Sequence, residues 1–302
     1  MNPLVPYDQA AGVLPFGLRQ LALAVPKTEQ LLVEEFRLRA GQKISVTFPE
    51  GEKVLPGSPI ISQSDLRTVL EIATQSSVHT ALDRIRNGYI TIRGGHRVGM
   101  CGSAVTKEGN IHNFREISSL NIRIARQIIG AGEELIRELL EYGELPSLLI
   151  VAPPGAGKTT ILRDLVRGLS DGVCGQPLRI GVADERGELG ALHNGVPQLN
   201  LGSHTDIIDG CRKADGLMIL LRGMNPQVLA MDEITSPEDI YALEEAAGCG
   251  TVLLATAHGG NLLDLKQRPL YRRLVEQRIF QKVLFIERYC GERRYRIENM
   301  PC

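Results

Sequence analysis

The pattern of hydrophobic and polar positions differs between the first and the second half of the chain. In the first half, residues 31–48 alternate apolar and polar side chains with Gly41 at a turn, which predicts an early β-hairpin. Apolar side chains then recur at helical spacing over 64–87, with a break near the middle, and predict two helices. Glycine-punctuated strands are expected within 89–129. We therefore expect residues 1–130 to form a smaller α+β domain.

Beyond Pro146, apolar segments alternate with amphipathic ones, which indicates strands alternating with helices. This alternation is typical of a parallel, doubly wound sheet. Strands are expected at 147–152, 178–185, 228–233 and 251–256. Helices are expected after the first strand, over 207–221 and from 236 to 248, and a hairpin is expected over 282–298. The prediction is an α/β fold with a linker helix in 131–145 and a mainly parallel domain over 146–302.

Composition favours a soluble, two-domain protein. A length of 302 residues with 43% hydrophobic content can supply two cores, and the 34 Lys and Arg nearly cancel the 35 Asp and Glu. No overall charge therefore draws the chain to nucleic acid or anionic lipid. The six cysteines form no C-x-x-C pair, so we interpret them as reduced and the protein as cytoplasmic. No secretory signal is evident, and no apolar run approaches the ~18 residues of a spanning helix.

The motif APPGAGKTT follows an apolar strand and opens a helix. Its glycines let backbone N–H groups turn around phosphates, and the helix N-terminus adds partial positive charge. We expect Lys158 to reach the β- and γ-phosphates of ATP, Thr159 to ligate Mg²⁺, and Thr160 to lie near the α-phosphate. Alanine replaces the usual first glycine, and its small side chain should preserve the loop. The residues expected to bind ATP are Ala152, Pro153, Pro154, Gly155, Ala156, Gly157, Lys158, Thr159 and Thr160.

An acidic pair ends the strand expected at 228–233. Carboxylates at the end of a neighbouring strand are what a phosphate loop needs beside Mg²⁺. We expect Asp232 to hold the metal, through water, and Glu233 to orient and deprotonate the attacking water. The alternative is a pair at a helix N-terminus outside the site.

A second acidic cluster, DERGE at 184–188, also follows an apolar strand. Glu185 and Glu188 are candidates to polarise water or to reach the γ-phosphate across a subunit boundary, and either becomes the base if Glu233 is not. The alternative is a solvated loop. His258 closes the strand TVLLATAH at its carboxyl end, where open α/β sheets bind ligands. It is a candidate sensor of the γ-phosphate, and the alternative is a structural histidine.

Phosphoryl transfer also requires positive charge in the transition state, which an arginine supplies in many such sites. The sequence does not rank the candidates. They are Arg222, Arg186 and, from the first domain, Arg93, Arg97, Arg123 and Arg126.

In its second half the chain resembles the ATPases of type II and type IV secretion systems. LRGMNPQVLAMDEITSPED and TVLLATAHGGN are similar to segments of those enzymes, and DERGE stands where they carry an acidic box. The resemblance implies a RecA/AAA-like P-loop domain, a ring of six subunits, and arginines contributed by the N-terminal domain. Asp232 departs from the glycine usual before the glutamate, which puts the water-activating residue in doubt.

Most of the chain more closely resembles the stage III sporulation protein AA family of endospore-forming bacteria. The resemblance lies in FRLRAGQ, GYITIRGGHRVGMCGSAV, SSLNIRIARQIIG, the P-loop and VADERGE. It implies an ATPase of the mother-cell cytoplasm that powers a secretion-like channel and works against membrane proteins of the channel complex.

Three hypotheses remain open at this point. The first is a ring-forming motor, a homo-hexamer recruited to the cytoplasmic face of a membrane complex. The second is a nucleic-acid-binding P-loop ATPase, which the near-zero net charge and the 4% aromatic content without tryptophan disfavour. The third is a nucleotide-binding scaffold with little turnover.

Overall fold

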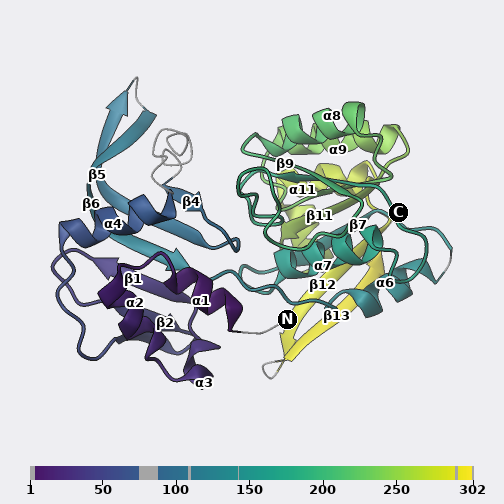
Figure 1. The fold of residues 1–302 in the computed structure, drawn as a ribbon. Coiled ribbons are helices and arrows are strands. Elements are labelled where there is room, and N and C mark those ends of the chain that lie inside the picture. The colour runs from purple at the N-terminus through teal and green to yellow at the C-terminus, as the bar shows by residue number, and fades with distance from the viewer. Residues whose placement is uncertain (1–3, 75–87, 108–109, 142, 290–291, 301–302) are drawn as a thin grey trace. The chain divides into compact units, whose positions relative to one another are not determined.

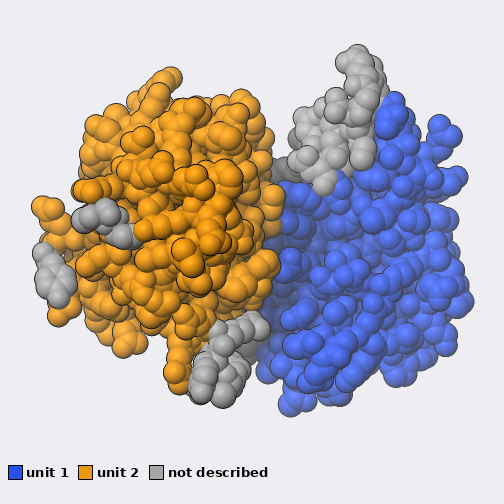
Figure 2. Space-filling view, turned by 180° about the vertical axis from the view of Figure 1, so that it is seen from behind, with its two compact units in different colours: residues 1–126, 191–198 blue, residues 127–190, 199–302 orange. Residues whose placement is uncertain are grey.

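The computed structural model describes residues 4–74, 88–107, 110–141, 143–289 and 292–300. They form two compact units (Figure 2). Unit 1 contains residues 1–126 and 191–198, and unit 2 contains 127–190 and 199–302. The domain bounds 1–130, 131–145 and 146–302 expected from the sequence stay a prediction. Among the described residues, no helix is long and apolar enough to cross a membrane.

Unit 1 is built on a six-stranded antiparallel sheet with the order β3-β2-β1-β6-β5-β4 (Figure 1). The strands are β1 (Glu35–Arg39), β2 (Ser45–Phe48), β3 (Gly51–Val54), β4 (Tyr89–Thr91), β5 (Arg97–Lys107) and β6 (Asn110–Arg123). The helices are α1 (Val5–Ala11), α2 (Phe16–Leu23), α3 (Lys27–Gln30) and α4 (Gln63–Ala73). The predicted hairpin is present as β1 and β2, and the first predicted helix as α4. The second predicted helix falls mostly within 75–87, outside the described residues.

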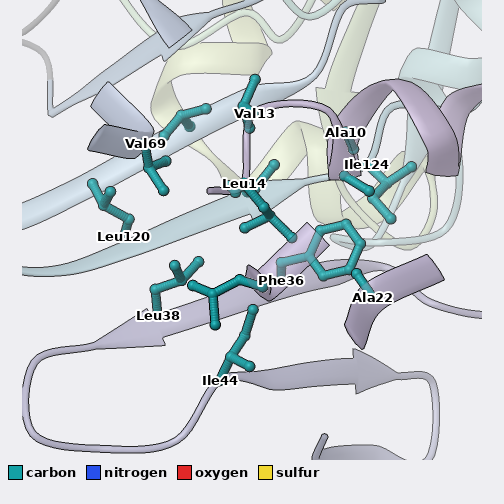
Figure 3. Close-up of a cluster of buried hydrophobic side chains, with 14 of the residues drawn as sticks. Ala10, Val13, Leu14, Ala22, Phe36, Leu38, Ile44, Val69, Leu120 and Ile124 are labelled. Carbon is teal, nitrogen blue, oxygen red and sulfur yellow. The ribbon is translucent and has the colours of Figure 1, made fainter. Parts of the chain in front are cut away.

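The core of unit 1 follows from strand alternation. Phe36 and Leu38 of β1 are fully buried, and their neighbours along the strand are partly exposed. These two side chains meet apolar residues of α1, α2, α4 and β6 in one cluster (Figure 3). The Tyr7 hydroxyl donates to Ala22 O at 2.7 Å, which fixes α1 to the end of α2.

Segment 191–198 is inserted into unit 1 from the second half of the chain. It carries Gln198, whose Oε1 accepts from Gly94 N at 2.8 Å. The loop that follows the acidic cluster DERGE therefore contributes to the N-terminal unit, an arrangement that no pattern in the sequence indicated.

Unit 2 is a seven-stranded sheet with the order β13-β12-β7-β11-β10-β8-β9, parallel except for the edge strand β13. The strands are β7 (Leu148–Ala152), β8 (Ile180–Asp184), β9 (Thr205–Asp209), β10 (Val228–Met231), β11 (Val252–His258), β12 (Lys282–Tyr289) and β13 (Glu292–Asn299). The helices are α6 (Glu133–Leu140), α7 (Lys158–Ser170), α8 (Lys213–Gly223), α9 (Pro237–Gly248), α10 (Leu262–Gln267) and α11 (Pro269–Glu276). The predicted fold class, a mainly parallel α/β domain preceded by a smaller α+β domain, is confirmed.

Helices cover both faces of this sheet (Figure 1). One apolar cluster joins the sheet to α6 and α7, and the other joins it to α8, α9 and α11. Strands β7, β8 and β10 are buried along their whole length, as parallel strands between two helical layers are. The helix predicted from 236 begins as expected, because Ser236 and Asp239 form a capping box at α9.

The helix predicted over 207–221 is wrong in its first part, since residues 205–209 form the edge strand β9. Ile207 packs into the cluster on the α7 side and Ile208 into the cluster on the α8 side. Two adjacent apolar residues that pack on opposite faces are typical of a strand between two helical layers. The same two residues also fit a helical pattern, so the sequence pattern did not separate strand from helix here. Gly210, with φ of 73°, separates β9 from α8.

Candidate nucleotide-binding site

The motif APPGAGKTT connects β7 to α7. Gly155 and Gly157 have φ of 71° and 103°, a region that glycine enters without steric cost, and Gly157 is the N-cap of α7. The departure at Ala152 has a simple explanation. Ala152 is the last residue of β7, pairs with His258 of β11, and does not have a positive φ. A glycine is therefore not required there.

Lys158 begins a chain of hydrogen bonds between side chains. Its ammonium donates to Ala152 O at 2.9 Å and to Pro153 O at 3.2 Å, and lies 2.9 Å from His258 Nδ1. Only 7% of Lys158 is exposed, and this burial lowers its pKa, while the carboxylates of Glu233 and Asp232 act in the opposite direction.

His258 extends this chain to the acidic pair, since its Nε2 lies 2.7 Å from Glu233 Oε1. The Lys158 ammonium can only donate a hydrogen bond, so His258 accepts it at Nδ1 and donates from Nε2 to Glu233. Glu233 is thereby oriented by His258 on one oxygen. Its other oxygen lies 3.9 Å from the Arg186 guanidinium.

Asp232 is held by two hydroxyl groups. Thr159 Oγ1 donates to Asp232 Oδ2, and Thr256 Oγ1 donates to Asp232 Oδ1, both at 2.7 Å. The hydroxyl and the carboxylate are hard oxygen ligands next to the phosphate loop, which fits Mg²⁺ held by few protein groups together with water and phosphate. Among the described residues, no group of three or more His, Cys, Asp or Glu side chains is placed to hold a metal ion, so an all-protein metal cage is not present there.

The backbone turns sharply at Glu233, which has a φ of 48°. A non-glycine residue in this region costs about 1–2 kcal/mol. The turn is fixed on both sides by β11, because Glu233 N donates to Thr256 Oγ1 at 2.8 Å and Ile234 N donates to Thr256 O at 2.8 Å. The side chain of Glu233 remains 30% exposed, so it is oriented and still accessible.

The cluster DERGE borders the same pocket as Asp232 and Glu233. Asp184 is buried and accepts from the backbone N–H groups of Glu188, Leu189 and Gly190. Burial raises the pKa of Asp184 above its ordinary value, although these three hydrogen bonds oppose the rise. Its carboxylate is thus engaged in shaping the loop.

Glu185 is engaged by a buried lysine at the start of α8. Lys213 Nζ lies 3.3 Å from Glu185 Oε2, 3.1 Å from Thr235 Oγ1 and 3.8 Å from Asp239 Oδ2. This lysine links DERGE to the N-terminus of α9. Arg163 links the end of DERGE to α7, since its guanidinium donates to the carbonyls of Glu188 and Leu189.

The structure brings some of the predicted site residues together and leaves others apart. Lys158, Thr159, Asp232, Glu233 and His258 are joined by the hydrogen bonds described above. Glu185 and Glu188 line the pocket that Asp232 and Glu233 also border. Thr160 lies in the first turn of α7. Pro154 is exposed in the loop, and Ala156 is buried in the cluster beneath it.

The arginine candidates remain predictions. Arg222 is exposed in the last turn of α8, which leads into the start of β10 and not its carboxyl end, so unit 2 does not bring it to the pocket. In unit 1, Arg126 donates to Val33 O and Gln30 O, which is a structural role. Arg97 lies over the Tyr89 ring, and Arg93 and Arg123 are exposed.

Three residues of the site were not predicted from the sequence: Thr256, Lys213 and Arg163. Thr256 offered a signal, because it is a polar residue inside the apolar strand β11 and is fully buried. Lys213 and Arg163 offered none, since charged residues at such spacings on helices are usually exposed.

A strand, a phosphate loop and a helix, with an acidic pair at the end of a nearby parallel strand, define the fold class of P-loop nucleotide-binding proteins. The chain belongs to the family described as sporulation stage III, protein AA, whose model matches residues 7–296. Stage III sporulation protein AA of Bacillus subtilis (strain 168) is 37% identical over 290 residues, covering 94% of this chain and 92% of that protein. The family resemblance predicted from the sequence is thereby confirmed.

More distant similarities extend over most of the chain. The protein SEEDLING PLASTID DEVELOPMENT 1 of Arabidopsis thaliana is 27% identical over 275 residues, which are 90% of this chain and 36% of that protein. The Legionella pneumophila ATPase DotB shares the fold, with a TM-score of 0.61, 16% identity, and coverage of 93% of this chain and 79% of that one. The pilus retraction motor PilT, solved with bound ADP, gives a TM-score of 0.62 at 16% identity over 89% of this chain and 80% of that one.

Proposed function

We propose that this chain is an ATP-hydrolysing motor of a sporulation channel or a similar secretion-like assembly. The observation that carries the proposal is the hydrogen-bonded chain from Lys158 through His258 to Glu233, next to the pair of Thr159 and Asp232. A phosphate-binding lysine, a pair of oxygen ligands and an oriented carboxylate are the groups that hydrolysis of a nucleoside triphosphate requires.

In this mechanism the backbone N–H groups of 155–160 and the Lys158 ammonium bind the phosphates. Lys158 exchanges its loop carbonyls for phosphate oxygens. Thr159 and Asp232 would hold Mg²⁺, and the metal would neutralise negative charge on the phosphates. Glu233 accepts a proton from the water that attacks the γ-phosphorus, and the bond to the β,γ-bridging oxygen breaks with release of ADP. His258 keeps Glu233 aimed at that water.

The likeness to DotB and PilT supports the motor part of the proposal, because DotB is an ATPase and PilT is a pilus retraction motor. Membership of the sporulation family supports a membrane-associated complex as the place of action. We further propose a homo-hexameric ring at the cytoplasmic face of that complex, in which hydrolysis changes the angle between the two parts of each subunit.

Nucleotide binding and hydrolysis by the purified chain test the first part. Lys158→Ala should abolish measurable ATP binding by calorimetry, with Lys266→Ala, an exposed lysine of α10, as the matched control. If Lys158→Ala binds ATP as the wild type does, the site is elsewhere.

Specific ATPase activity measured across protein concentration tests the ring. A rise with concentration, accompanied by a larger oligomer in sedimentation with a non-hydrolysable ATP analogue, is the expected result. Constant activity from a chain that stays monomeric with and without the analogue would contradict the ring.

A further inference from the structure

The hairpin at the end of the chain carries an arginine that lies against the phosphate loop. Strand β12 pairs in parallel with β7, and β13 forms the outer edge of the sheet (Figure 1). A β-carbon placed on Gly157 would lie 3.2 Å from Arg293 Cζ and 3.3 Å from its Nε and Nη2. The guanidinium of Arg293 therefore packs directly on the loop, one residue before Lys158.

The alternation of β13 supports this placement independently. Ile297 packs into the cluster on the α7 side of the sheet. Arg296 lies over the ring of Phe285 at 4.8 Å from its centroid, and Phe285 belongs to the cluster on the opposite side. Since side chains alternate along a strand, Arg293 shares the face of Ile297, which is the face of α7 and the phosphate loop.

The groups around Arg293, which is itself exposed to solvent, favour the binding of an anion. The guanidinium contacts the N-cap of α7, where the helix carries partial positive charge. Lys158 adds a full positive charge at the next residue. Within the part of the chain that the structure describes, no carboxylate forms an ion pair with Arg293. Two cations and a helix N-terminus at one loop are the arrangement that binds a polyphosphate.

We infer that Arg293 is a nucleotide-binding residue that contacts the phosphate chain of the ATP held by the P-loop of its own subunit. The inference rests on the proposed function and adds a residue to its site. Arginine suits this role because its planar group forms paired hydrogen bonds to phosphate oxygens and stays charged at all relevant pH values. The terminal hairpin then contributes to nucleotide affinity as well as to the edge of the sheet.

Equilibrium titration with ATP, ADP and inorganic pyrophosphate tests the inference. Arg293→Gln should weaken binding of all three by about tenfold or more, the effect of losing a charged hydrogen bond. Arg294→Gln is the matched control, because residue 294 lies on the same strand with its side chain on the other face, and it should bind as the wild type does. Thermal unfolding without nucleotide should be similar for both variants, which excludes damage to the fold.

Arg293→Lys should recover only part of the lost affinity, since lysine keeps the charge and lacks the paired donors. Wild-type affinity in Arg293→Gln would overturn the inference. Weaker nucleotide binding with unchanged pyrophosphate binding would also overturn it, because the contact would then be with the base or the ribose. If the wild-type chain itself binds no ATP, the proposed function fails, which is a distinct result.

The same titrations assign the contact to one subunit. Mixed assemblies of Lys158→Ala with Arg293→Gln should stay weak in ATP binding, because no subunit carries both residues. Recovery in the mixture would show that Arg293 acts on a neighbouring subunit and would contradict the assignment to its own P-loop.

Discussion

Two acidic loops leave the carboxyl ends of strands in unit 2, and their carboxylates are used differently. At the end of β10, Asp232 is held by two threonine hydroxyls and Glu233 by His258, so both keep oxygen lone pairs for other ligands. At the end of β8, Asp184 is buried under three backbone N–H groups and Glu185 is paired with Lys213. We interpret the first loop as the reaction site and the second as a scaffold beside it.

The largest effect should come from Asp232, the residue of the β10 loop that we propose holds Mg²⁺. Asp232→Asn keeps the shape of the side chain but removes the charge that a divalent cation needs. We expect kcat/KM for ATP to fall by about a hundredfold, with a higher Mg²⁺ concentration for half-maximal activity. Steady-state hydrolysis across a Mg²⁺ series measures this. An unchanged Mg²⁺ dependence would remove Asp232 from the metal site.

The equivalent change in the β8 loop should act on stability. Asp184→Asn leaves at least one of the three N–H groups without a good acceptor, so the free energy of unfolding should fall by about 1–3 kcal/mol. Urea unfolding measures it, with Asp206→Asn on the exposed side of β9 as the control. Full stability in Asp184→Asn, together with a severe loss of turnover, would make Asp184 catalytic and would break the comparison.

These two loops also mark how far the sequence could predict the site. In the sequence, each loop is an apolar strand followed by carboxylates. Nothing in DERGE or MDE distinguishes a carboxylate that is held by the protein from one that can bind a ligand. The difference depends on Thr256 from β11 and Lys213 from α8, which reach the loops only in the folded sheet. The P-loop was predictable because its groups are consecutive in sequence.

The fold could be predicted where hydrophobic periodicity and capping signals agree, and the prediction failed where they do not. The capping box of Ser236 and Asp239 fixed the start of α9, and fully apolar runs fixed β7 and β10. Strand β9 was missed because Ile207 and Ile208 face two different helical layers and fit a helical pattern as well. The assignment of segment 191–198 to unit 1 depends on long-range contacts, which no local pattern encodes.

A smaller effect should follow from loss of the residue that aims Glu233. His258→Gln removes the imidazole between Lys158 and Glu233, so we expect kcat to fall by about tenfold with ADP affinity nearly unchanged. Paired measurements of kcat and of ADP binding separate the two quantities. A loss of ADP affinity with normal kcat would place His258 in phosphate binding and not in the orientation of Glu233.

The smallest effect is a pH dependence confined to the β8 loop. The pKa of Asp184 is raised by burial, so the folded state binds its proton more tightly than the unfolded state does. The stability linked to this proton is present at low pH and is lost as pH rises through the raised pKa. The stability advantage of the wild type over Asp184→Asn should therefore be larger near pH 4 than near pH 7, to be measured by urea unfolding at about these two values. A larger advantage at the higher pH would contradict the buried assignment.

The most direct test compares one carboxylate from each loop in the same assay. With saturating ATP, Glu233→Gln should bind ATP normally and lose about a hundredfold or more of kcat, because no base remains for the attacking water. Glu185→Gln should keep kcat within a few-fold, since its carboxylate serves Lys213. Normal turnover in Glu233→Gln, with the large loss found in Glu185→Gln instead, would contradict the account.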